Sequence, residues 1–268
     1  MFGFSRFHRW RQYRLLRKHR IPAGTWKQVV SQVPVLQTLK RREQHRLRKL
    51  SSLFLHDKTF HGGAGLEIDD FMRASIAAQA CLLVLNLDLR LYNDWSEIIV
   101  YPDAFIAPQT ETDAAGVVHE SKQTLGGQAW HQGPVVLAWS DIQQDMQDES
   151  THKGSNVVLH EFAHKLDFLN GAANGMPPLH QEMKRAQWTH EFSAAYDDLI
   201  QRIHQRKRLV MNPYAATDPA EFFAVMTEVY FEDPQRLQQR FTGVYQKMSE
   251  YYQQDPLSRI ADNAAIST

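Results

Sequence analysis

The sequence contains only one cysteine, Cys81, and no long apolar run. A single thiol cannot form an intramolecular disulfide, which excludes a disulfide-stabilised scaffold and favours a reducing compartment. The most apolar stretch, residues 76–85, has about half the length that a membrane-spanning helix needs. Residues 2–20 alternate aromatic and basic side chains and lack the continuous apolar core of a secretory signal. We therefore expect a cytoplasmic protein without a membrane span.

Acidic residues are almost absent from the first fifty positions, which hold 14 Lys and Arg and only one acid, Glu43. The remaining 218 residues hold 16 basic and 29 acidic residues, so the two parts carry formal charges of +13 and −13. Such a basic segment can contact nucleic acid, an acidic protein or a membrane surface. We adopt the simpler interpretation, that it packs on its own acidic body or is a solvated helix, and do not expect a nucleic-acid partner.

Helical patterns dominate the chain. Leucines among basic residues predict a helix at residues 35–55, and helix formers at apolar spacing predict a buried central helix at residues 69–89. Strand-like composition is confined to three short stretches, at residues 96–101, 117–118 and 135–139. The sequence therefore predicts an α+β protein that is predominantly helical. We expect a basic helical arm at residues 1–55 and one larger domain at residues 56–268.

The segment 157–168 contains His160, Glu161 and His164 in the pattern His-Glu-x-x-His. At about 100° per residue, the two histidines differ by about 40° and one helical turn, so both imidazoles can reach one tetrahedral ion. Residues 154–156 and 170–171 supply a helix start and stop. This is the arrangement of zinc hydrolases, and its alternative is a buried structural pair of histidines.

The chemistry of such a site requires these residue types. Neutral imidazoles leave a net positive charge on zinc, which lowers the pKa of bound water from about 15.7 toward about 7. Glu161 lies about 100° round the helix from His160, where it can take a proton from that water and return it to the leaving amine. We therefore expect a hydrolase with one Zn²⁺ per chain.

A catalytic zinc ion normally has three protein ligands, and the third is not fixed by spacing alone. Asp167 lies about 20° from His160 on the helical wheel, and we interpret it as a carboxylate that supports a histidine or the local structure. Glu182, 18 residues after His164, is one candidate for the third ligand.

Glu221 is the other candidate, and spacing favours it only slightly. It follows Asp218 and Pro219, which start a helix well, and it stands where the carboxylate of a capping box would also stand. Glu228 lies two turns further on the same face, where it can hold a ligand histidine or a helix end.

From residue 60 to residue 234 the sequence resembles the Mlc titration factor A peptidases of bacterial cytoplasm. The resemblance is carried by short motifs at residues 65–66, 76–81, 133–137, 160–167 and 212–223. It implies a zincin-like metallopeptidase domain, related to the catalytic domain of anthrax lethal factor, with a small sheet beside the metal-binding helix. It also implies that His160, His164 and Glu221 bind zinc, that Glu161 is the general base, and that Tyr214 donates a hydrogen bond to the oxyanion.

The resemblance further implies aminopeptidase-type hydrolysis of short peptides and binding of the glucose repressor Mlc. The alternative is a mainly non-proteolytic regulator that sequesters a transcription repressor. Because peptide substrates of zincins pair with a sheet edge, we expect residues 135–139 to form that edge strand.

Overall fold

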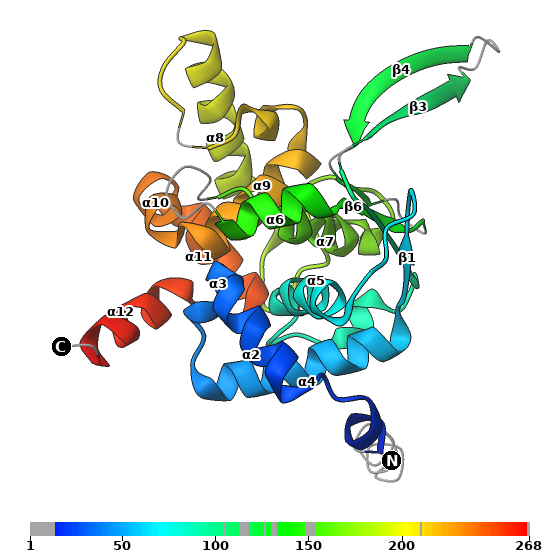
Figure 1. The fold of residues 1–268 in the computed structure, drawn as a ribbon. Coiled ribbons are helices and arrows are strands. Elements are labelled where there is room, and N and C mark those ends of the chain that lie inside the picture. Colours follow the sequence, from blue (N-terminus) through cyan, green and yellow to red (C-terminus); the bar gives the residue numbers. More distant parts are fainter. Residues whose placement is uncertain are drawn as a thin grey trace.

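The computed structural model describes residues 14–103, 105–112, 118–125, 127–129, 133–147, 154–209 and 211–266. Within these residues, helices make up most of the molecule, and a small sheet lies to one side of the helical body (Figure 1). Two further strands, β3 (Phe105–Thr112) and β4 (Val118–Leu125), project as a separate antiparallel ribbon. The predominantly helical α+β class is the one that the sequence predicts.

The longer helices are α2 (Ala23–Gln32), α4 (Arg41–Asp57), α5 (Asp70–Leu83), α6 (Trp139–Gln147), α7 (Val157–Asp167), α8 (Arg185–His204), α9 (Pro219–Glu232), α11 (Thr242–Tyr252) and α12 (Pro256–Ile266). The shorter ones are α3 (Pro34–Gln37), α10 (Pro234–Arg240) and the 3₁₀ turns η1 (Leu89–Tyr92), η2 (Phe168–Asn170) and η3 (Pro213–Ala216). Residues 14–19 are helical as well. No helix in the described ranges is both long and apolar enough to cross a membrane.

Two predicted helices differ from the observed ones. The helix expected at residues 35–55 is divided into α3 and α4, because Lys40 has an extended backbone and its N–H donates to Glu43 Oε2 at 2.9 Å, which starts α4. The helix expected at residues 69–89 begins as predicted, with Asp69 accepting from Met72 N, but it ends at Leu83. The Leu82 carbonyl accepts from a distant side chain, Gln254 Nε2, which sequence periodicity does not reveal.

The sheet has the order β1-β2-β6-β5, with bounds β1 (Thr59–Gly62), β2 (Glu97–Tyr101), β6 (Val135–Ala138) and β5 (Gly127–Ala129). β1, β2 and β6 are parallel, and β5 pairs antiparallel with β6. β2 and β6 confirm two predicted strands. Of the third, Val118 begins β4 and Val117 lies outside the described residues.

The hydrophobic core extends across the expected boundary between arm and domain. Ile21, Trp26 and Val29 belong to the same buried cluster as the central helices. The boundary at residue 55 falls inside α4. The division of the chain at this residue stays a prediction.

Candidate metal centre

Helix α7 brings the two histidines into the middle of the molecule. It packs against α5, α9 and β5, and most of its side chains are buried. The helix starts at Asn156, whose side-chain Oδ1 accepts from Leu159 N at 2.9 Å. Past η2 the chain turns at Gly171, whose φ of +106° lies in the left-handed region that glycine tolerates. The cap at Asn156 and the turn at Gly171, which follows η2, therefore bound the helical segment that the sequence predicts.

The imidazoles of His160 and His164 meet at one point. Their Nε2 atoms are 3.1 Å apart, and the rings are inclined by 80°. One helical turn therefore aims both ring nitrogens at the same small volume, as expected from their spacing.

Glu221 reaches this point from the first turn of α9. Asp218 caps that helix by accepting from Ala220 N at 2.8 Å and from Glu221 N at 3.0 Å. Glu221 Oε2 lies 3.0 Å from His160 Nε2 and 3.4 Å from His164 Nε2. Although Glu221 occupies the capping-box position, its carboxylate faces the two imidazoles.

These three groups fit a zinc ion. Their ligand atoms all lie within 4.8 Å of one another. A tetrahedral ion with bonds of about 2.0–2.2 Å separates its ligands by about 3.3 Å, close to the observed spacing. Glu221 Oε2 is buried at ion-pair distance from the imidazoles, but it makes no correctly directed hydrogen bond within the described part of the chain. Two imidazoles and one carboxylate are also a donor set that catalytic zinc sites use.

The charges of the three groups are strongly coupled. Burial opposes the charged form of His160, but Glu221 and Glu228 outweigh it and raise the pKa of His160 well above its usual value. Burial likewise raises the pKa of Glu221, but the neighbouring His160 and His164 outweigh it and hold that pKa well below the usual range. The centre therefore favours an ionised carboxylate, which is the form that can bind a cation.

Glu161 lies beside this centre on α7 and is only 3% exposed. Its Oε2 has no hydrogen-bond partner among the described residues. Burial raises the pKa of Glu161 to about 7, although His160 and His164 act in the opposite direction. A carboxyl group with a pKa near neutrality can both take and return a proton, which is what a general base in hydrolysis needs.

Glu228 contacts both groups that its sequence position allowed, a histidine of α7 and the start of that helix. Its Oε1 is 2.7 Å from His160 Nδ1, and its Oε2 accepts from Asn156 N at 2.6 Å. The contact at Nδ1 leaves Nε2 of His160 to face Glu221 and His164. Carboxylates in this position fix the orientation and tautomer of a metal-binding histidine.

A network of side chains around Asn156 supports the start of α7. Asn156 Nδ2 donates to Gln79 Oε1 at 2.8 Å and to Glu232 Oε1 at 2.9 Å. Glu232 Oε2 accepts from Gly154 N at 3.1 Å, and Asp145 Oδ2 accepts from Val157 N at 2.9 Å. Gln79, Asp145 and Glu232 were not predicted from the sequence. The one available signal was the spacing of Glu228 and Glu232, which lie one turn apart on α9.

Asp167 and Glu182 are not part of the three-residue cluster. Asp167 is fully buried, and its Oδ2 accepts from Asn174 N at 2.9 Å and Gly175 N at 2.8 Å. It is therefore a structural carboxylate for the loop after α7, one of the two interpretations given above. Glu182 is exposed and precedes α8.

Tyr214 lies near the centre, on η3. Asn212 caps this turn by accepting from Tyr214 N at 3.0 Å. The ring centroids of Tyr214 and His160 are 6.1 Å apart, and Tyr214 is 51% exposed. Burial of part of the side chain and the nearby Glu221 raise the pKa of Tyr214. Its hydroxyl therefore stays protonated at neutral pH and is able to donate a hydrogen bond.

Comparison with known proteins shows the family of this chain. The family model described as glucose-regulated metallo-peptidase M90 matches residues 7–253. The chain belongs to this family. Similar proteins named Mlc titration factor A include one from Klebsiella pneumoniae strain 342, 38% identical over 240 residues, which cover 89% of each chain. Another, from Serratia proteamaculans strain 568, is 39% identical over 87% of this chain and 90% of its own.

Membership of the M90 metallopeptidases implies a bound metal ion, and His160, His164 and Glu221 form a group able to hold one. The family that the sequence motifs indicate is thus confirmed.

One expectation for this M90 chain is wrong. Residues 135–139 do not form an edge strand, because β6 lies between β2 and β5. Trp139 is moreover the first residue of α6. β5 packs on α7 and has only one partner in the described sheet, β6. Strand order depends on pairing between distant segments, which the local composition of residues 135–139 does not reveal.

Proposed function

We propose that this M90 protein is a zinc-dependent peptidase. The observation that carries the proposal is the convergence of His160 Nε2, His164 Nε2 and Glu221 Oε2, at separations of 3.0–3.4 Å. These residues would hold one Zn²⁺ per chain. When bound, zinc supplies a positive charge that acidifies water and polarises a carbonyl group.

Glu161 is the general base of the proposed reaction. It takes a proton from the attacking water and returns it to the amine of the cleaved peptide bond. Without metal, burial raises the pKa of Glu161 to about 7. The positive charge of a bound zinc ion would lower this pKa, which favours the carboxylate form that a general base needs. Burial also excludes competing solvent from the carboxylate.

Tyr214 donates its hydroxyl proton in a hydrogen bond to the oxyanion that forms on the scissile carbonyl. One such donor typically contributes about 3–4 kcal/mol to transition-state stabilisation. The edge of β5 that has no partner among the described strands is the element on which we expect the substrate backbone to pair, through main-chain hydrogen bonds. The zincin-like architecture, with its relation to anthrax lethal factor, is part of the same proposal.

We further infer a cytoplasmic aminopeptidase-type activity on short peptides, together with binding of an Mlc-type repressor. The second part is supported by the name Mlc titration factor A that similar proteins carry. The same name favours a second candidate function, in which the protein mainly sequesters the repressor and hydrolysis is secondary.

The Glu161→Gln variant tests the mechanism. We expect it to retain about one zinc per chain, measured by elemental analysis, while peptide turnover falls by about 10²–10⁴-fold. Wild-type turnover in this variant would refute Glu161 as the base. Repressor binding by the same variant separates the two functions. Undiminished binding without peptide turnover would favour sequestration over proteolysis.

The third ligand is tested by a matched pair of variants. Glu221→Ala is expected to lose both zinc and activity, whereas Glu182→Ala, at an exposed position, is expected to keep both. The opposite result would identify Glu182 as the ligand.

A further inference from the structure

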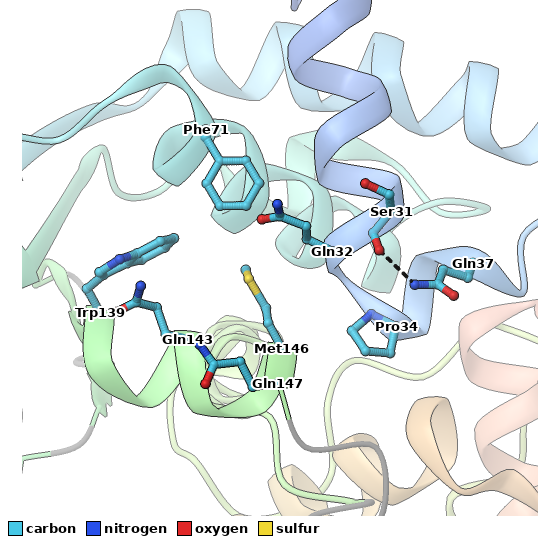
Figure 2. A pocket seen from close by; sticks show the side chains of 9 residues that line it. All are labelled: Ser31, Gln32, Pro34, Gln37, Phe71, Trp139, Gln143, Met146 and Gln147. Atoms are coloured by element: carbon cyan, nitrogen blue, oxygen red, sulfur yellow. Dashed lines mark hydrogen bonds between the residues drawn. The ribbon is translucent and has the colours of Figure 1, made fainter.

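A pocket lies away from the metal centre, between α2, α3, α5 and α6. It is a half-open cavity of about 410 Å³. That volume lies within the range of small-molecule sites. Figure 2 shows the side chains around it, which are Ser31, Gln32, Pro34, Gln37, Phe71, Trp139, Gln143, Met146 and Gln147.

None of the nine described residues that line this pocket is ionisable. The described lining therefore carries no charge, although 22% of the residues of the chain are charged. A ligand with a phosphate, carboxylate or ammonium group would lose part of its hydration here without gaining an opposite charge. The lining therefore favours a neutral ligand.

The apolar part of the pocket has aromatic character. Phe71 and Trp139 are perpendicular, with ring centroids 6.2 Å apart and an interplanar angle of 87°. Together with Met146 they are only partly buried, although they pack against the core. Figure 2 shows Phe71, Gln32 and Met146 facing a common space, with Trp139 beside them. The electron-rich faces of such rings attract the weakly positive C–H groups of a ligand.

The polar part consists of primary amides, which both donate and accept hydrogen bonds. Gln37 Nε2 is already engaged, because it donates to Ser31 O at 3.0 Å (Figure 2). Gln32, Gln143 and Gln147 are exposed, and within the described part of the chain their amides form no hydrogen bond. A matching ligand must therefore offer several donors and acceptors of its own.

We propose that this pocket binds a small neutral carbohydrate. The hydroxyl groups of a sugar both donate and accept, which matches the amides of Gln32, Gln143 and Gln147. The C–H face of the sugar ring packs on Trp139 and Phe71. None of the residues that line the pocket belongs to the metal centre, and the proposal does not rest on the peptidase function.

Titration calorimetry of the full-length protein with glucose and with maltose tests this proposal. Glucose 6-phosphate and glucuronate serve as charged analogues of similar shape. We expect one of the neutral sugars to bind with a Kd of about 1 mM, and the charged analogues to bind at least about tenfold more weakly.

Four variants assign the binding to this pocket. Gln32→Ala and Gln143→Ala remove exposed amides without disturbing the core and should each weaken binding about fivefold or more. Gln143→Glu keeps the shape but adds a charge and should weaken it further. Gln205→Ala removes an exposed amide at the end of α8 and should leave binding unchanged.

Three results would overturn the proposal. The first is that neither neutral sugar binds at about 50 mM, a concentration far above the expected Kd. The second is that the charged analogues bind as tightly as the neutral sugars. The third is that the Gln143→Ala and Gln205→Ala variants bind the sugar with equal affinity. Binding of an uncharged proline-rich peptide in place of the sugars would overturn it as well.

Discussion

Glu228 connects His160 to the beginning of the helix on which His160 itself lies. One oxygen of the carboxylate is 2.7 Å from His160 Nδ1, and the other accepts from Asn156 N at 2.6 Å. Because Glu228 and Glu221 are both on α9, the same helix supplies a candidate ligand and the group that orients another. The geometry of the centre therefore depends on how α7 and α9 pack.

The Glu228→Gln variant is expected to bind zinc about 10–100-fold more weakly, because the neutral amide orients His160 less firmly and no longer increases its basicity. Competition with a chromophoric chelator measures this affinity. Glu182→Gln removes one acid from the surface and is the matched control for the change in net charge. Equal affinities in the two variants would show that Glu228 has no influence on the centre.

Asn156→Ala should destabilise the protein by about 1–2 kcal/mol, since it removes the cap of α7. It also leaves Glu232 with fewer hydrogen bonds. Asp69→Ala removes the equivalent cap of α5, where Asp69 accepts from Met72 N at 2.7 Å, and should cost a similar amount.

The two cap variants are distinguished by zinc binding. Only Asn156→Ala is expected to lower zinc affinity, because only that cap contacts the network that reaches His160. Urea unfolding of the metal-free proteins and chelator competition together give both quantities. A parallel loss of zinc affinity in Asp69→Ala would mean that the effect comes from general destabilisation.

The two histidines and Glu161 were predictable because their relationship lies within a single helix. Helical geometry fixes the positions of residues that are one turn apart, and apolar flanking residues indicate that the helix is buried. The family motifs added Glu221 and Tyr214, which approach from a different part of the chain. Spacing alone favoured Glu221 over Glu182 only slightly.

Features that depend on contacts between distant segments could not be predicted in the same way. β6 has the composition of a strand, but its interior position follows from its pairing with β2 and β5. Asp145 lies on α6, and nothing in the local sequence indicates that its carboxylate accepts from Val157 N. At the end of α5, the Leu82 carbonyl likewise accepts from Gln254, which is far away in the chain.

Tyr214→Phe is expected to reduce kcat by about 10²–10³-fold, because it removes a donor that acts mainly in the transition state. KM and zinc affinity should change little, since the ring is retained and Tyr214 is not among the proposed ligands. Tyr196→Phe is the matched control. Its hydroxyl donates to Ala216 O at 3.0 Å on the same turn, so it tests whether a structural change in η3 alone lowers kcat.

Lys58 should make stability depend on pH in the alkaline range. Its ammonium group donates to Tyr92 O and Trp95 O and lies 4.1 Å from the centroid of the Trp95 ring. Burial lowers the pKa of Lys58 from 10.5 to about 8. Between these two values the unfolded chain binds more protons than the folded one, so the contribution of Lys58 to the free energy of unfolding rises with pH.

The Lys58→Met variant isolates this contribution. The free energy of unfolding of the wild type minus that of the variant should increase between pH 8 and pH 10, with a slope that does not exceed about 1.4 kcal/mol per pH unit. Urea unfolding in the presence of a chelator, at three or more pH values, measures it. A difference that stays constant or falls over this range would show that burial does not disfavour the charged form of Lys58.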